Sequence, residues 1–224
     1  MSGRPLLARA ELPGWLHPVA DVAASVRPEQ LSRFLPPEEG GRDSAVLMLF
    51  GEGEKGPDLL LIERAHDLRS HAGQPAFPGG ALDPGDDGPV AAALREAVEE
   101  TGLDPAGVAP FATLPALFLP PSGFVVTPVL GWWREPSPVA VVDPGEVASV
   151  HRVPVADLVD PAHRVRVRHP SGYVGPGFTV SGLLVWGFTA GLIDRVFRLA
   201  GWERPWDTER WADLPNVVDR PAAS

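Results

Sequence analysis

The apolar residues follow patterns that separate strands from helices along the chain. Residues 44–50 and 58–65 are almost continuous apolar runs, and the segment between them, 51–57, is rich in Gly. We therefore expect these two runs to pair as a β-hairpin. Further strand patterns, separated by turn residues, cover 108–120, 123–133, 147–155 and 164–180.

The clearest helical pattern covers residues 89–103. Pro89 stands near its start, the body is rich in Ala, and Gly102 stands where the helix should stop. Weaker helical patterns cover 17–26, 28–34 and 185–201. The order of strands, helix, strands and helix predicts an α+β fold, a mixed sandwich rather than a regular βαβ winding.

The chain divides into three parts. Residues 1–43 are rich in Pro and are expected to pack as an N-terminal extension on a main domain that covers 44–201. The tail, 202–224, places three Trp among charged residues, a composition that suits either packing on its own domain or a homodimer interface.

Composition limits the possible partners. The 224 residues carry a formal net charge of -10 and contain no dense basic run, so nucleic acid is not expected as a partner. The absence of Cys excludes disulfides and Cys-based metal sites. No apolar run is long enough for a signal peptide or a membrane span, and we expect a cytoplasmic protein.

Three glutamates stand close together in the predicted helix 89–103. Glu96, Glu99 and Glu100 have the spacing i, i+3 and i+4, which places them on one face, where they repel one another. Such a face is either ordinary solvated surface or a site for a hard divalent cation, because Mg²⁺ binds carboxylate oxygens. Arg95 has the spacing to orient Glu99, or it pairs with an acid of the preceding loop, at Asp83, Asp86 or Asp87.

The loop before this helix contains Gly79 and Gly80, which let bare backbone approach closely, so that a carbonyl becomes a further possible ligand. Together the loop and helix resemble the Nudix box. The positions that match are Gly80, Arg95, Glu96, Ala97, Glu99, Glu100, Gly102 and Leu103. Two departures are visible: the first acid is Asp86 instead of Glu, and eight residues instead of seven separate it from Arg95. If Asp87 is taken as the first acid instead, the surplus residue lies between Gly80 and the acid, not between the acid and Arg95.

The resemblance to Nudix hydrolases implies a fold and a metal-dependent activity. The implied fold is an α/β/α sandwich with a mixed central sheet, and the implied cofactor is Mg²⁺ or Mn²⁺. Glu99 and Glu100 would bind the metal with the Gly79 carbonyl, and Glu96 would bind metal or help to deprotonate water. Arg95 belongs to the same catalytic set, and Glu146 stands where such enzymes often have an additional acid on a loop.

Residues 59–80 resemble the additional motif of coenzyme A pyrophosphatases. The matching positions are Arg64, Leu68, His71, Gly73, Phe77 and Pro78, and Ala65 replaces the usual Ser. Segment 121–133 resembles the same branch, in which a Pro-Ser-Gly turn leads into a strand beside the substrate. This likeness implies hydrolysis of CoA or acyl-CoA to 3′,5′-ADP and 4′-phosphopantetheine or its acyl derivative.

The expected substrate contacts are Arg64, Arg69, His71, Gly80 and Ser122, and most have a structural alternative. Arg64 suits bidentate phosphate binding, but an isolated Arg on a strand also serves as a surface ion-pair partner. Arg69 is either solvent-facing or near a 3′-phosphate. His71 either satisfies loop backbone or meets substrate, and Ser122 is either part of a plain turn or a substrate contact.

Two other functions remain open from the sequence. One is a Nudix enzyme that acts on another nucleoside diphosphate derivative, such as ADP-ribose or NADH. The other is a non-catalytic CoA-binding module. The three intact glutamates argue against the module, since a protein freed from catalysis has no physical need to keep a self-repelling cluster.

Overall fold

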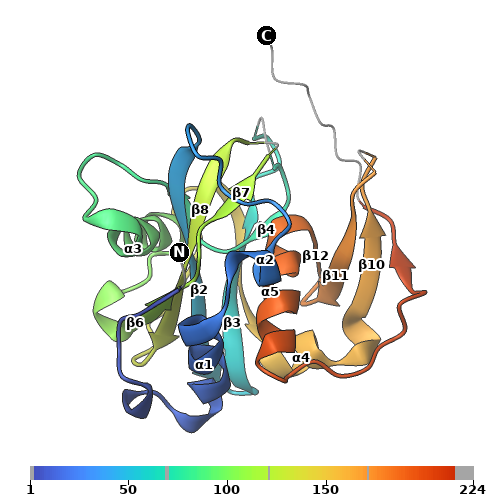
Figure 1. The fold of residues 1–224 in the computed structure, drawn as a ribbon, viewed down its shortest axis with the longest axis horizontal. Coiled ribbons are helices and arrows are strands. Elements are labelled where there is room, and N and C mark those ends of the chain that lie inside the picture. The colour runs from blue at the N-terminus through green and yellow to red at the C-terminus, as the bar shows by residue number, and fades with distance from the viewer. Residues whose placement is uncertain (1–2, 69–70, 121, 171, 215–224) are drawn as a thin grey trace.

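A mixed β-sheet runs through the middle of the molecule, with helices on both of its faces (Figure 1). The computed structural model describes residues 3–68, 71–120, 122–170 and 172–214. Within them the sheet has the order β1-β6-β8-β2-β3-β4, with β5 on β2, β7 on β8 and β9 on β3. Only β2 and β8 pair in parallel among these strands, which confirms the predicted mixed sheet. The strands are β1 (Arg4–Pro5), β2 (Arg42–Gly53), β3 (Gly56–Arg64), β4 (Pro75–Ala76), β5 (Gly79–Ala81), β6 (Val108–Thr113), β7 (Leu117–Leu119), β8 (Phe124–Trp133) and β9 (Val147–Pro154).

The β2–β3 hairpin forms the centre of this sheet and is buried on both faces. Leu47 and Leu49 of β2 belong to the apolar cluster that packs against α3. Met48 and Phe50 alternate with them and belong to the larger cluster on the opposite face. Burial on both faces explains why the sequence of this strand is continuously apolar instead of alternating.

Helix α3 (Gly88–Thr101) covers one face of the sheet. It buries Ala92, Ala93 and Ala97 against β2, and these small side chains let the helix approach the strand closely. It ends at Gly102, which adopts φ 68° and donates its N–H to the Val98 carbonyl. A residue with a Cβ is strained in that left-handed conformation, so Gly102 fixes the end of the helix as predicted.

The opposite face is covered by helices α1 and α5 and by a second sheet (Figure 1). The second sheet has the order β12-β11-β10-β13. The helices there are α1 (His17–Ser25), α2 (Pro28–Leu31), α4 (Val155–Val159) and α5 (Gly187–Leu199), and the strands are β10 (Arg164–Arg168), β11 (Val174–Val180), β12 (Leu183–Val185) and β13 (Trp211–Ala212). Short 3₁₀ helices cover Arg9–Glu11, Gly14–Leu16, Pro105–Gly107 and Pro161–His163. None of the described helices combines the length and the apolar composition that crossing a bilayer requires.

The described parts of the N-terminal extension and of the tail pack on this core. Strand β1 pairs with β6, and Val19 and Val22 of α1 are buried in the larger apolar cluster. In the tail, Trp202 makes edge contacts with the rings of Phe50 and Phe197. Strand β13 adds to the second sheet in parallel with β10.

Several elements differ from the sequence predictions. Helix α2 ends at Leu31 instead of residue 34, because Ser32 is already extended. Residues 183–185 form strand β12, so α5 begins only at Gly187. Region 108–120 holds two strands, β6 and β7, separated at Pro115, which has no N–H to give to a ladder. The sequence pattern does not indicate helix α4 or strand β13, because both are short.

Replacing Gly79 by Ala should destabilise the protein, because a Cβ there would lie 2.3 Å from the Ala45 carbonyl oxygen and 2.7 Å from the Val46 Cα. Both neighbours are backbone atoms of the central strand and cannot move cheaply. We expect the free energy of unfolding to fall by about 1–3 kcal/mol, measured by urea denaturation. Gly85→Ala in the loop after β5 is the control, since no atom lies within 4 Å of its Cβ position. Equal stability of the two variants would contradict the packing described.

Candidate active site

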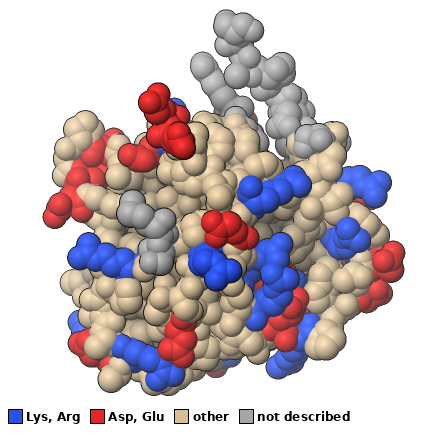
Figure 2. All heavy atoms as spheres, in the orientation of Figure 1, with Lys and Arg blue, Asp and Glu red and all other residues tan. Residues whose placement is uncertain are grey.

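The three glutamates of α3 are buried to very different degrees. The side chain of Glu99 is 55% exposed, that of Glu96 is 18% exposed and that of Glu100 only 4%. Acidic side chains also gather on the loop that leads into α3, at the left edge of the molecule (Figure 2). The helix face therefore reaches from solvent into the protein, with Glu100 innermost.

Glu100 lies between the β5 backbone and the end of β3. Its Oε2 accepts a hydrogen bond from the Gly79 N–H at 2.9 Å, and its Oε1 lies 3.9 Å from Nη1 of Arg64. Burial raises the pKa of the Glu100 carboxyl to about 8, although the Gly79 N–H and Arg64 oppose this. Repulsion from Glu96 and Glu146 adds to the rise. A carboxylate at this position is costly unless a further positive charge joins it.

Glu96 occupies the space above Gly80. A Cβ on Gly80 would lie 2.3 Å from Oε1 of Glu96, so the glycine leaves room for the carboxylate. Burial raises the pKa of Glu96; the Arg95 guanidinium opposes the rise, and Glu99 and Glu146 add to it by repulsion. The carboxylate of Glu146 is thus close enough to act on both Glu96 and Glu100.

Arg95 holds this acidic region together. Its Nε and Nη2 donate to the two oxygens of Asp86 at 3.1 and 3.0 Å, and its Nη1 donates to Glu96 and Glu99 at 3.0 and 3.1 Å. Nη2 also donates to the Ala81 carbonyl at 3.0 Å. Both contacts considered from the sequence, to Glu99 and to the preceding loop, are present. Because these acceptors are all protein groups, we infer that Arg95 positions the site.

The two candidate loop acids have different surroundings. The Asp86 carboxylate is buried against Arg95, and its hydrogen bonds hold the pKa of Asp86 below its usual range. Asp87 is exposed and stands at the N-terminal boundary of α3, where its side chain makes no capping hydrogen bond. Asp86 is therefore the acid that the fold connects to the glutamate helix, and the surplus residue lies between it and the helix.

Arg64 is the described cation nearest to Glu100. It is the last residue of β3, its side chain is 29% exposed, and within the described residues its buried Nε–H has no hydrogen-bond partner. Its contact with Glu100 is long for an ion pair. The partly exposed guanidinium is therefore not engaged by a close ion pair with Glu100.

The other predicted residues make only local contacts or fall outside the described part. His71 is exposed with φ 57°, and its Nδ1 lies 3.0 Å from the Gln74 side-chain oxygen. Ser122 donates to the Leu119 carbonyl of its own turn. Arg69 lies outside the described residues. Sequence reasoning missed the Gly79 N–H as a partner of Glu100, because a backbone amide has no signature in residue type.

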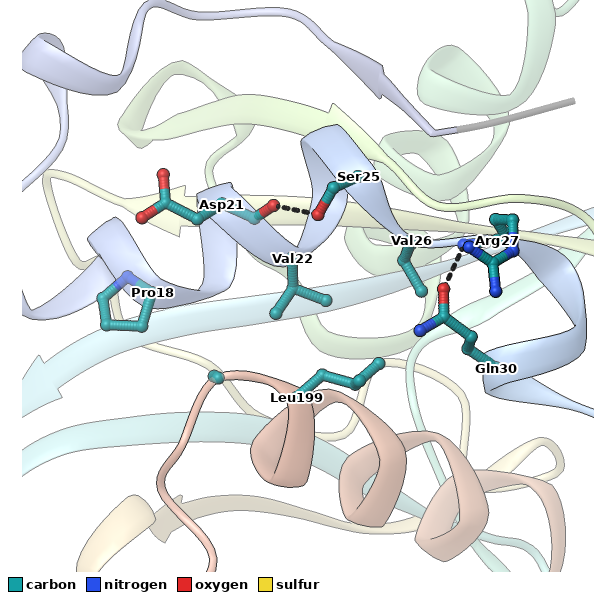
Figure 3. Close-up of a pocket in the computed structure, with 9 residues that line it drawn as sticks. Pro18, Asp21, Val22, Ser25, Val26, Arg27, Gln30 and Leu199 are labelled. Atoms are coloured by element: carbon teal, nitrogen blue, oxygen red, sulfur yellow. Dashed lines mark hydrogen bonds between the residues drawn. The ribbon is translucent and has the colours of Figure 1, made fainter.

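A shallow pocket of about 450 Å³ lies away from the glutamates, between α1, α2 and the C-terminal end of α5 (Figure 3). Val22, Val26 and Leu199 line it together with polar groups such as Ser25, whose hydroxyl donates to the Asp21 carbonyl. These helices cover the face of the sheet opposite α3. The pocket is therefore not the site formed by Glu96 and Glu100.

Comparison with known proteins assigns the chain to a family. A family model described as the NUDIX domain matches residues 41–173. The chain belongs to the Nudix hydrolase family. A Citrobacter koseri protein described as an uncharacterized Nudix hydrolase, NudL, is 39% identical over 177 residues, 73% of this chain and 88% of its own. The NudL protein of Cronobacter sakazakii is 40% identical over 144 residues, 61% of this chain and 72% of its own.

A solved structure supports the same fold for this Nudix hydrolase. The crystal structure of a Nudix hydrolase from M. smegmatis, RenU, superimposes with a TM-score of 0.51 at 20% sequence identity. The match covers 75% of this chain and 91% of that one. The α/β/α arrangement around a mixed sheet is thus the Nudix fold. The enzyme is a Nudix pyrophosphatase, and Nudix hydrolases typically use divalent metal ions and bind nucleotide-diphosphate substrates.

The residues of this Nudix hydrolase suit a hard divalent cation by their chemistry. In the described ranges, no three His, Asp or Glu side chains lie together as a group that could hold a metal ion, and Arg95 bonds one oxygen each of Glu96 and Glu99. Mg²⁺ does not need a closed protein cage, because it keeps water and shares its coordination with substrate phosphate. The donors present are all oxygen, and space for the Glu96 carboxylate is kept by Gly80.

Replacing Arg95 by Lys should weaken both stability and activity, because Lys cannot match the two Asp86 oxygens and reach the other acceptors together. We expect the free energy of unfolding to fall by about 2 kcal/mol, measured by urea denaturation, with kcat reduced in parallel. Arg134→Lys is the matched control, because Arg134 is exposed and lies 3.9 Å from its nearest carboxylate, Glu135. A stability change no larger than that of the control would contradict the positioning role.

Proposed function

We propose that this Nudix hydrolase cleaves the diphosphate of CoA or acyl-CoA, releasing 3′,5′-ADP and 4′-phosphopantetheine or its acyl derivative. The proposal starts from the motif in residues 59–80, whose spacing resembles coenzyme A pyrophosphatases. The observation that supports it best is the position of Arg64, a residue of that motif. Arg64 lies beside Glu100 with hydrogen-bonding capacity to spare, where a diphosphate would meet the glutamates.

The same motif forms the approach to the glutamates. Its glycine Gly73 donates its N–H to the Arg64 carbonyl at 3.1 Å, so the loop after β3 closes back on the strand. Phe77 is buried in the core and anchors the end of the loop. Gly79 and Gly80 then bring the backbone to Glu100 and Glu96. One continuous segment thus connects the cation Arg64 with the carboxylates of α3.

The proposed roles follow from these positions. Arg64 binds a phosphate oxygen of the substrate through its guanidinium. Glu96, Glu99, Glu100, Glu146 and the Gly79 carbonyl would hold Mg²⁺ or Mn²⁺, which neutralises diphosphate charge and lowers the pKa of a bound water. Water oxygen attacks phosphorus, the anhydride P–O bond breaks, and a carboxylate oxygen of Glu96 takes the proton.

A substrate panel tests the proposal. The purified protein is incubated with Mg²⁺ and, in turn, CoA, an acyl-CoA, ADP-ribose and NADH, and kcat/KM is measured with product identification by mass spectrometry. We expect the highest kcat/KM for CoA or an acyl-CoA. Glu100→Gln purified in parallel controls for contaminating hydrolases.

Two results would overturn the substrate assignment. A higher kcat/KM for ADP-ribose or NADH would favour a Nudix pyrophosphatase of different specificity. Tight CoA binding without turnover, with either Mg²⁺ or Mn²⁺, would favour a non-catalytic binding module.

A further inference from the structure

A second polar cluster lies at the end of the β3–β9 pair and is formed by Glu63, Ser149 and His151. Ser149 Oγ lies 2.7 Å from Oε2 of Glu63 and 2.6 Å from Nε2 of His151. Ser149 stands directly opposite Glu63 in the ladder, and His151 stands two residues further along β9, on the same face. None of these residues belongs to the glutamate site of α3.

The hydrogen bonds of the cluster have a defined direction. An ionised Glu63 only accepts, so the single hydroxyl proton of Ser149 is donated to it. His151 must then donate its Nε2–H to the lone pair of Ser149 Oγ. The chain runs from His151 through Ser149 to Glu63. This order differs from a serine-hydrolase triad, in which the acid binds the imidazole, so Ser149 is not arranged as a nucleophile.

The cluster adjoins an irregularity in the strand pairing. Glu63 pairs with Ser149, but the next residue, Arg64, pairs with Val147, so Ala148 has no opposite residue. One extra residue in a strand is a β-bulge, which bends the strand and redirects side chains. Immediately beyond it, the Ala65 N–H donates to the Glu146 carbonyl at 2.9 Å. The bulge thus stands where the two strands deliver Arg64 and Glu146 to the glutamate site.

Glu63 and Arg64 point to opposite faces of the sheet, since they are consecutive in a strand. Arg64 approaches Glu100 on the α3 side. Glu63 follows Leu59 and Leu61, which pack in the cluster on the α5 side. Its second oxygen lies 3.6 Å from Nε2 of His66, in the loop after Arg64. The carboxylate of Glu63 therefore contacts both strand β9 and the loop that follows Arg64.

We propose that Glu63, Ser149 and His151 form a positioning set that fixes the bulge and thereby holds Arg64 and Glu146 in register with Glu100. The proposal rests on the roles given to Arg64 and Glu146 under the proposed function. None of the three residues touches the reacting atoms. Loss of the Ser149 hydroxyl frees the bulge and lets Arg64 shift relative to Glu100.

Substitutions at Ser149 test this with kinetics. Ser149→Ala should lower kcat roughly ten- to a hundredfold, since small misplacements of binding groups have effects of that size. Ser149→Thr keeps the hydroxyl and suits a strand, so it should restore most of kcat. Ser25→Ala, on the exposed end of α1, is the matched control with unchanged kcat. A wild-type kcat for Ser149→Ala, or no recovery in Ser149→Thr, would overturn the proposal.

A double-mutant cycle separates positioning from general destabilisation. If Ser149 acts through Arg64, Ser149→Ala should lower kcat/KM by a much smaller factor in an Arg64→Lys background than in the wild type. Equal fold losses in kcat/KM in both backgrounds would indicate a merely structural role and would contradict the proposal.

Amide hydrogen exchange provides a readout that needs no substrate. The Ala65 N–H, bonded to Glu146 across the bulge, should exchange faster in Ser149→Ala than in the wild type and Ser149→Thr. Unchanged exchange would overturn the positioning set even if the enzyme is active. Failure of the wild type to hydrolyse any substrate of the panel would instead reject the proposed function, and the exchange result would still decide whether the cluster holds the bulge.

Discussion

Replacing Glu100 by Gln should lower kcat/KM roughly a thousandfold, the size expected when several kcal/mol of charge stabilisation are lost. Gln has the same shape and its side-chain oxygen can still accept the Gly79 N–H, so the fold around β5 should persist. What disappears is the carboxylate that a bound cation would hold ionised at the most buried position of the acidic face. The measurement is kcat/KM on the best substrate of the panel, with circular dichroism to confirm folding.

Glu135→Gln is the matched control for this substitution. Glu135 is exposed and far along the chain from α3, so the same chemical change there should leave kcat/KM unchanged. Retention of more than about a tenth of the wild-type activity by a folded Glu100→Gln enzyme would contradict the role given to Glu100.

The stability of the metal-free protein should fall as pH rises from about 4.5 to about 8. The pKa of Glu100 is about 8 in the folded protein, compared with its ordinary 4.5. Between these values the folded state holds a proton that the unfolded state has released, so each rise in pH favours unfolding. The total loss is roughly a few kcal/mol. Below both pKa values, and above both, Glu100 does not make the free energy of unfolding depend on pH.

Urea denaturation in EDTA at a series of pH values checks this. Glu100→Gln cannot titrate, so its stability should depend on pH much less than that of the wild type between pH 5 and 8. A smaller slope of the same sign should remain, because burial also raises the pKa of Glu96. Identical slopes for the wild type and Glu100→Gln would show that Glu100 is ionised in the folded, metal-free protein and would contradict its burial.

Features that depend on neighbouring residues could be predicted from the sequence. The helix around Glu96 follows from its Ala-rich body and from Gly102, whose left-handed conformation ends it. The β2–β3 hairpin follows from two apolar runs joined by a Gly-rich turn. The shared face of Glu96, Glu99 and Glu100 follows from helical spacing alone. These features need no information about distant parts of the chain.

Features that depend on distant pairing could not be predicted. Parallel pairing of β10 with β13 joins residues about 45 positions apart, as in Arg166 with Trp211. The sequence of neither strand indicates which strand it pairs with. The contact between Glu63 and Ser149 depends on the register of β3 with β9. Its only sequence signal is two polar residues, Ser149 and His151, that share one face of a strand.

Direct metal binding tests the central claim, that Glu96, Glu99 and Glu100 hold divalent cations. Mn²⁺ is titrated into the metal-free protein and followed by electron paramagnetic resonance, with and without the diphosphate substrate. The wild type should bind Mn²⁺, more tightly with substrate, and Glu99→Gln and Glu100→Gln should lose most of this uptake, whereas Glu135→Gln should not. Equal uptake by all four proteins, or none by the wild type even with substrate, would contradict the account.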